Sequence, residues 1–141
     1  MSKVAVVFWT SGDHTRAMAE IVADAAREAG ADVELIEAAS FSSADLDNFD
    51  AIAFGCPAMG DEVLEESEFQ PMWDDVKESL GSKKVGLFGS YGWGGGDWMR
   101  LWAEEAEGLG VNLVKGGIAA EEFEDGAPET QDLIELGQAL A

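Results

Sequence analysis

The regular alternation of short apolar runs with segments of helical periodicity constrains this chain more than any other feature. Apolar runs predict strands at residues 4–9, around 33–35, and at 51–56, 85–91 and 111–119. Helical patterns lie between or after them, at 15–29, 67–80 and 97–108 and from 128 onward. Alternating strands and helices with short connections predict an α/β fold, a parallel sheet covered by helices on both faces.

Boundary residues indicate where the helices begin and end. Gly30 is expected to end the first helix. Ser67 can cap the second, in which Pro71 is tolerated only within the first turn. Asp97 is the expected N-cap of the third helix, and Gly108 is expected to close it.

Composition excludes several classes of protein. A chain of 141 residues that is 47% hydrophobic and 26% charged predicts one globular domain over residues 1–141. No apolar run approaches the roughly 18 residues of a membrane span. The chain enters its first strand without a signal-peptide pattern, and its lone cysteine, Cys56, fits a reducing compartment and a place in the core. We therefore expect a cytoplasmic protein.

The charge is strongly acidic, with 29 Asp and Glu residues against 8 Lys and Arg residues and a formal net charge of -21. Such a field disfavours nucleic acids and anionic lipid surfaces, steers basic protein partners, and favours a monomer. Acidic residues gather between Asp61 and Glu78 and again between Glu121 and Asp125. These clusters suit either docking of basic redox partners or general solubility, and the sequence does not separate the two.

Three predicted loops follow strands at their carboxyl ends, where open parallel sheets bind ligands. The first, residues 10–15, combines three hydroxyls with backbone amides at the start of a helix, which is typical of an anion site. It lacks the Gly-Lys-Ser/Thr sequence of a P-loop and the spaced glycines of a dinucleotide-binding loop. An ordinary capped turn has a similar sequence.

The other two loops each combine a large, polarisable side chain with glycines. Residues 57–62 place Met59 beside Gly60, and residues 90–96 place Trp93 between glycines. Two broad apolar side chains can cover the two faces of a flat aromatic ligand, and glycines let peptide groups approach its polar edge. The two loops therefore predict a clamp around an aromatic ring.

The loops resemble those of the short-chain flavodoxins, most closely the clostridial type, and the resemblance covers nearly the whole chain. The residues that match the flavin-flanking loops are Met59, Gly60, Asp61 and Glu62 in one loop and Ser90, Tyr91, Gly92, Trp93 and Gly94 in the other. The resemblance implies a flavodoxin-like three-layer sandwich with a five-stranded parallel sheet in the order 2-1-3-4-5. It also implies non-covalently bound FMN and low-potential one-electron transfer among cytoplasmic redox proteins.

The resemblance also implies which residues bind the cofactor. The full set is Thr10, Ser11, Gly12, Asp13, His14, Thr15, Pro57, Ala58, Met59, Gly60, Asp61, Glu62, Ser90, Tyr91, Gly92, Trp93 and Gly94. Met59 would cover the inner flavin face, Trp93 the outer face, and Glu62 would hold the N3–H group. Because Gly60 has no Cβ, its peptide can turn its carbonyl toward flavin N5 when the ring gains a proton on one-electron reduction.

The phosphate loop departs from the family pattern. Gly12 and Asp13 stand where the family has a hydroxyl residue and a glycine, and His14 occupies an asparagine-like position. An inward Asp13 side chain would repel the phosphate, whereas an outward one would be harmless. His14 either donates to the phosphate or lies at a solvated helix start, and Arg16 can offset the charge of Asp13.

Acidic residues near the flavin imply a low potential, because fully reduced FMN is an anion. Carboxylates of the second loop and of Glu65 and Glu66 would oppose that charge. The alternative function is a flavodoxin-like NAD(P)H or quinone reductase, which should have a further pocket and longer loops. A receiver-type regulator would need an acidic pair where Phe8 and Trp9 stand. The sequence shows neither metal-ligand spacing nor a catalytic triad, and the resemblance implies an electron-transfer protein, not an enzyme.

Overall fold

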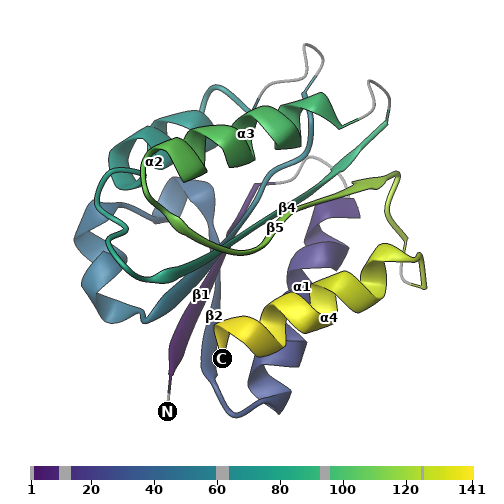
Figure 1. The fold of residues 1–141 in the computed structure, drawn as a ribbon, viewed down its shortest axis with the longest axis horizontal. Helices are drawn as coiled ribbons and strands as arrows, with labels where there is room; N and C mark the ends of the chain where they lie inside the picture. The colour runs from purple at the N-terminus through teal and green to yellow at the C-terminus, as the bar shows by residue number, and fades with distance from the viewer. Residues whose placement is uncertain (1, 10–13, 60–63, 93–95, 125) are drawn as a thin grey trace.

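The computed structural model describes all residues except 1, 10–13, 60–63, 93–95 and 125. Its strands form one parallel sheet in the order β2-β1-β3-β4-β5 (Figure 1). They are β1 (Lys3–Phe8), β2 (Asp32–Glu37), β3 (Ala51–Gly55), β4 (Lys84–Tyr91) and β5 (Asn112–Glu121). This order confirms the one that the resemblance implies.

Helices cover both faces of the sheet. They are α1 (His14–Glu28), α2 (Phe69–Val76), α3 (Asp97–Gly108) and α4 (Glu129–Leu140). Helices α1 and α4 lie side by side on one face, and α2 and α3 lie on the other (Figure 1). Two short 3₁₀ helices, η1 (Ala38–Ser40) and η2 (Ser43–Asn48), connect β2 to β3, and the sequence periodicity did not predict them. In the described residues no helix is long and apolar enough to cross a membrane.

The sheet separates two hydrophobic cores. Along β1, Ala5 and Val7 belong to the core under α2 and α3, whereas Val4 and Val6 belong to the core under α1 and α4. All four are fully buried. A strand buried on both faces needs apolar residues at every position, which explains the continuous apolar run in the sequence.

The two helices α1 and α4 pack unusually closely at Gly137. A Cβ built on Gly137 would lie 2.5 Å from the carbonyl oxygen of Val22 and 2.7 Å from the Cβ of Ala25. Only a glycine at this position of α4 lets the two backbones approach so far. This contact holds α4 against α1, the helix that follows the first candidate loop.

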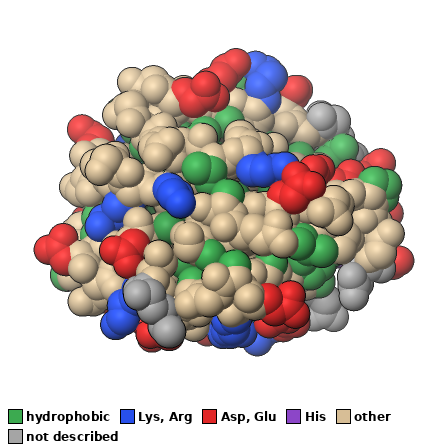
Figure 2. All heavy atoms as spheres, turned by 60° about the horizontal axis from the view of Figure 1, so that its bottom comes forward, with side chains coloured by type: hydrophobic (Ala, Val, Ile, Leu, Met, Phe, Trp, Pro, Cys, Tyr) green, Lys and Arg blue, Asp and Glu red, His purple; other side chains and the backbone are tan. Residues whose placement is uncertain are grey.

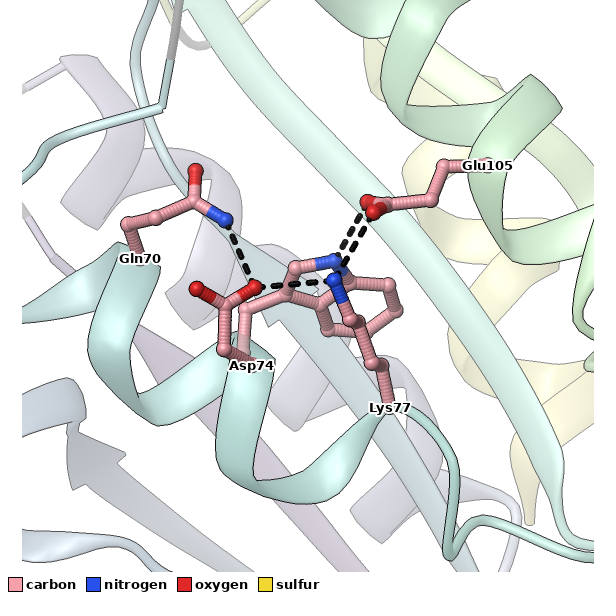
Figure 3. Close-up of polar contacts among 5 residues, drawn as sticks. Gln70, Asp74, Lys77 and Glu105 are labelled. Atoms are coloured by element: carbon pink, nitrogen blue, oxygen red, sulfur yellow. Dashed lines mark hydrogen bonds and ion pairs between the residues drawn. The ribbon is translucent and has the colours of Figure 1, made fainter.

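On the opposite face a polar cluster joins α2 to α3 (Figure 3). The Lys77 ammonium lies 2.9 Å from Asp74 Oδ1 and 2.9 Å from Glu105 Oε2. The buried Trp73 indole donates to Glu105 Oε1 at 2.8 Å. Hydrogen bonding to Asp74 and Glu105 raises the pKa of Lys77, and hydrogen bonding to Lys77 lowers the pKa of Asp74. The Glu105 carboxylate thus accepts a hydrogen bond from a buried indole and pairs with an ammonium group.

Several predicted helix boundaries need correction. The N-cap of α3 is Gly96, with φ +84°, and Asp97 is instead its first helical residue. The predicted end of α3 at Gly108 is confirmed, and the glycine in the left-handed conformation lies two positions later, at Gly110 with φ +81°. The N-cap of α2 is Glu68, not Ser67, and the helix ends at Val76. Gly30 has φ +102° and follows α1 as predicted.

Candidate functional site

The three predicted loops start from the carboxyl ends of adjacent strands. Phe8, Gly55 and Phe88 lie in register across β1, β3 and β4. Beyond the strands the pairing continues, because the Cys56 amide donates to the Phe88 carbonyl at 3.1 Å and the Ala58 amide donates to the Ser90 carbonyl at 3.0 Å. These bonds bring the start of the second loop and the start of the third loop side by side.

A close backbone contact at Gly89 fixes this junction. A Cβ at Gly89 would lie 2.1 Å from the carbonyl oxygen of Cys56. The same oxygen accepts a hydrogen bond of 3.2 Å from the indole nitrogen of Trp98 on α3. Because neither partner can shift without breaking a buried contact, the positions of Pro57 and Ser90 relative to each other are well determined.

The far end of the second loop is held by the buried carboxylate of Glu65. It accepts hydrogen bonds from the backbone amides of Ser67 at 2.8 Å, Glu68 at 2.7 Å and Phe69 at 2.9 Å, and from the Ser67 hydroxyl. These amides are the free donors at the start of α2. Burial disfavours the charged form, but the bonds from Ser67, Phe69 and Glu68 outweigh it and lower the pKa of Glu65 to about 2.

Cys56 and Glu65 close the second loop from both sides. The Glu65 amide donates to Cys56 Sγ at 3.4 Å, so the residues before and after the loop are in direct contact. Burial raises the pKa of the Cys56 thiol to about 12. A protonated, buried thiol is a poor nucleophile, which agrees with the prediction that Cys56 is a core residue.

A separate bond links the residue that follows β1 to the start of α2. The half-buried Trp9 follows β1 and donates from its indole nitrogen to Glu68 Oε1 at 2.9 Å. Glu68 also donates its amide to Glu65. The indole of Trp9 therefore ties the end of β1 to the N-terminus of α2.

At the start of α1, Thr15 presents a buried hydroxyl without a partner among the described residues. Among the described residues, the indole nitrogen of Trp102 is the other buried side-chain atom without a hydrogen-bond partner. It lies within the aromatic core, where the Trp102 ring packs edge-on against Trp73 and Phe69. The Thr15 hydroxyl instead lies in the first turn of a helix, where the helix dipole favours an anion. This unsatisfied donor fits the phosphate group that the resemblance implies.

A segment that the sequence did not indicate joins two of the loops. The Phe123 carbonyl accepts a hydrogen bond of 2.6 Å from His14 Nδ1, and the Phe123 amide donates to Ser90 Oγ at 3.0 Å. Phe123 follows β5 and is buried. No periodicity marks such a residue, because its contribution is made by its backbone.

Eight of the predicted cofactor-binding residues lie in described segments, and the segments converge on the carboxyl edge of β1, β3 and β4. These residues are His14, Thr15, Pro57, Ala58, Met59, Ser90, Tyr91 and Gly92. The other nine, Thr10, Ser11, Gly12, Asp13, Gly60, Asp61, Glu62, Trp93 and Gly94, lie outside the described residues. Pro57, Ala58, Met59 and Tyr91 are all partly exposed, so apolar surface remains available at this edge.

The chemistry of this edge suits a flavin nucleotide better than a metal ion. Partly exposed apolar side chains lie on the second and third loops, and on the first a hydroxyl at a helix N-terminus has no partner within the described segments. Within the described part of the chain, no group of three or more His, Cys, Asp or Glu residues could hold a metal ion. An aromatic ring with an anionic tail matches these features.

Comparisons with known proteins agree with this geometry. Residues 6–135 match the family model for flavodoxin. The chain is 43% identical to the flavodoxin of Megasphaera elsdenii over 98% of both chains, and 42% identical to that of Clostridium beijerinckii over 96% of this chain and 97% of the relative. The solution structure of two-electron reduced M. elsdenii flavodoxin superimposes with a TM-score of 0.86 over 96% of this chain and 98% of that chain. The chain belongs to the flavodoxin family.

Proposed function

We propose that this flavodoxin is a low-potential, one-electron carrier that holds FMN non-covalently at the carboxyl edge of β1, β3 and β4. Family membership supports an FMN-binding electron carrier and does not favour a reductase. The observation that carries the proposal is the convergence of the described parts of three loops at this edge, with partly exposed apolar side chains on two of them and, on the other, the Thr15 hydroxyl, which has no partner among the described residues.

Each loop has a separate role in the proposed site. Residues 10–15 hold the phosphate, with the Thr15 hydroxyl and the N-terminus of α1 as donors. Residues 57–62 cover one face of the ring with Met59, and Glu62 anchors its edge. Residues 90–94 cover the other face with Trp93. When bound, FMN supplies the ability to accept and release single electrons.

In this proposal the chain positions the flavin ring, offers a hydrogen-bond acceptor at its N5 edge and excludes water from its two faces. Gly60 is proposed to offer its carbonyl to the N5 edge of the ring after one-electron reduction, because a residue without a Cβ turns at little steric cost. A bond of this kind contributes about 1 kcal/mol. The apolar side chains Met59 and Trp93 keep water from both ring faces, which strengthens the effect of nearby charges.

The charge distribution supports a low potential and an oriented approach of partners. Glu66, Glu68, Glu121, Glu122 and Glu124 are exposed in segments that follow the carboxyl ends of the strands or lead into α2. Three of the eight basic residues, Lys3, Lys83 and Lys84, instead lie at or beside the opposite, amino ends of β1 and β4. The exposed acidic residues of the carboxyl edge therefore lie away from these three lysines.

The α1 and α4 side differs from that edge. Figure 2 shows acidic and basic side chains interspersed on the face that it turns toward the viewer. In α1, Arg16 pairs with Glu20 at 3.4 Å and Arg27 with Asp24 at 3.3 Å. Paired charges of this kind attract a distant partner weakly. The proposed partners are redox proteins with basic docking faces that approach the acidic carboxyl edge of a cytoplasmic, monomeric, single-domain carrier.

A binding titration with a reduction assay tests this function. Apoprotein titrated with FMN should quench flavin fluorescence with a stoichiometry of one, and riboflavin should bind more weakly because it lacks the phosphate. The FMN complex should then be reduced by dithionite or a flavodoxin reductase, but not by NADH alone. Direct reduction by NADH would favour the reductase alternative, and equal affinity for FMN and riboflavin would contradict the assigned phosphate loop.

A further inference from the structure

We infer that His14 and Ser90 are positioning residues that act through the backbone of Phe123, so that the segment after β5 holds the phosphate loop and the ring loop in register. This inference rests on the proposed function, because it concerns the residues that surround FMN. Its basis is a continuous chain of two hydrogen bonds from His14 Nδ1 to the Phe123 carbonyl and from the Phe123 amide to Ser90 Oγ.

Phe123 is well suited to be the fixed point of this bridge. Its side chain is 1% exposed and belongs to the core between the sheet and α1 and α4. The preceding residue, Glu122, donates its amide to the Tyr91 carbonyl at 2.7 Å and has φ +43°, a left-handed conformation that a glutamate adopts at some cost. Two successive amides after β5 are thus bonded to the end of β4.

The bridge connects parts of the chain that are distant in sequence. His14 lies 109 residues from Phe123 and is the first described residue after residues 10–13. Ser90 lies 33 residues from Phe123 and directly precedes Tyr91 at the start of the third loop. A shift of Phe123 would therefore move the start of α1 relative to the end of β4.

Hydrogen-bond chemistry gives His14 a role that differs from the two the sequence left open, which were a phosphate donor and a residue at a solvated helix start. A carbonyl oxygen only accepts, so His14 Nδ1 must carry the proton of the 2.6 Å bond. In the neutral imidazole the other nitrogen, Nε2, then has a lone pair and no proton to donate to a phosphate. Neutral His14 therefore donates its hydrogen bond to the Phe123 carbonyl and has none to donate to a phosphate. Ser90 accepts from the Phe123 amide, and its own hydroxyl proton stays free.

The first test uses variants at His14 and Ser90. His14→Asn retains an N–H donor on a similarly branched side chain, whereas His14→Leu has a comparable shape and no donor. We expect His14→Leu and Ser90→Ala each to weaken the binding of both FMN and riboflavin by about tenfold, and His14→Asn to stay within about twofold of wild type. The double variant His14→Leu/Ser90→Ala should lose less affinity than the product of the single losses, because both act on one segment.

The two flavins separate positioning from direct contact. If His14→Leu weakens FMN binding and leaves riboflavin binding unchanged, His14 contacts the phosphate and the inference is wrong. It is also wrong if His14→Leu changes neither affinity while wild type binds FMN. If wild type binds neither flavin, the proposed function itself fails.

A second measurement needs no variant and so does not depend on how a substitution affects folding. The chain has 1 histidine, so nitrogen-15 NMR of imidazole reports on His14 alone. In alkaline buffer, where imidazole groups are neutral, the FMN complex should show a protonated Nδ1 and an unprotonated Nε2. The opposite tautomer in that complex would overturn the inference.

Discussion

The carboxylate of Glu65 accepts a hydrogen bond of 2.9 Å from the backbone amide of Phe69, the first residue of α2. Three further donors from Ser67 and Glu68 converge on the same carboxylate. The acidic residue that the sequence suggested as part of a repulsive field near the flavin therefore also satisfies free backbone amides at the start of α2. The effect of Glu65 on the stability of α2 and the effect of its charge on the flavin potential have to be tested separately.

Replacing Glu65 should destabilise the protein. Glu65→Ala removes the acceptor for three backbone amides at the start of α2 and should cost about 2–4 kcal/mol of unfolding free energy, measured by urea denaturation of the apoprotein. Glu66→Ala is the matched control, because its side chain is exposed and adjacent in sequence. A loss at Glu65 no larger than that at Glu66 would contradict the capping role.

The contribution of Glu65 should also depend on pH in a defined direction. The pKa of its carboxyl is lowered from 4.5 to about 2 in the folded protein. A lowered pKa means that its stabilising effect is present above about pH 4.5 and is lost as pH falls toward 2. The difference in unfolding free energy between wild type and Glu65→Gln should therefore shrink between about pH 5 and pH 2. A difference that stays constant or grows over this range would contradict the assignment.

The polar cluster between α2 and α3 predicts different results for two substitutions of Glu105. Glu105→Ala leaves the buried Trp73 indole without its acceptor and should cost about 1–3 kcal/mol. Glu105→Gln can still accept from Trp73 and loses only the ion pair with Lys77, which should cost less than about 1 kcal/mol. Thermal or urea unfolding of both variants tests this order, and equal losses would show that the indole bond contributes little.

Gly137 should not tolerate a larger residue. A Cβ at this position would lie 2.5 Å from the Val22 carbonyl, so Gly137→Ala should push α4 away from α1 and cost about 1–3 kcal/mol despite the better helix propensity of alanine. Gln138→Ala, at the exposed next position of α4, is the control. A Gly137→Ala variant more stable than wild type would show that the two helices separate easily.

The electrostatic basis of the low potential is best tested at Glu66. Its side chain is exposed, so Glu66→Gln removes a charge with little effect on packing. It should raise the midpoint potential of the second reduction step by roughly 10–40 mV, which corresponds to about 0.2–1 kcal/mol for an exposed charge. Glu28→Gln, at the end of α1 opposite to the site, should leave the potential unchanged. Equal shifts in both variants would indicate a general charge effect.

Much of the fold could be predicted because it depends on local patterns. The five strands follow from apolar runs, since a strand buried on both faces, such as β1, has no polar position to interrupt it. Gly30 marks the end of α1 because its left-handed conformation is strained for other residues. The order of the strands came from the resemblance, because periodicity alone does not determine which strands are neighbours.

The missed features depend on contacts that local patterns do not reveal. Ser67 has the sequence of an N-cap, but the carboxylate of Glu65 reaches the same amides. The bridge through Phe123 joins residues 109 positions apart, and it uses backbone atoms that every residue type has. Helices η1 and η2 are too short to show periodicity.

A potentiometric titration of the FMN complex under anaerobic conditions tests the central claim most directly. A one-electron carrier should be reduced in two well-separated one-electron steps, with a stable half-reduced state between them and the second step at the lower potential. A single two-electron step without a half-reduced state would contradict the account.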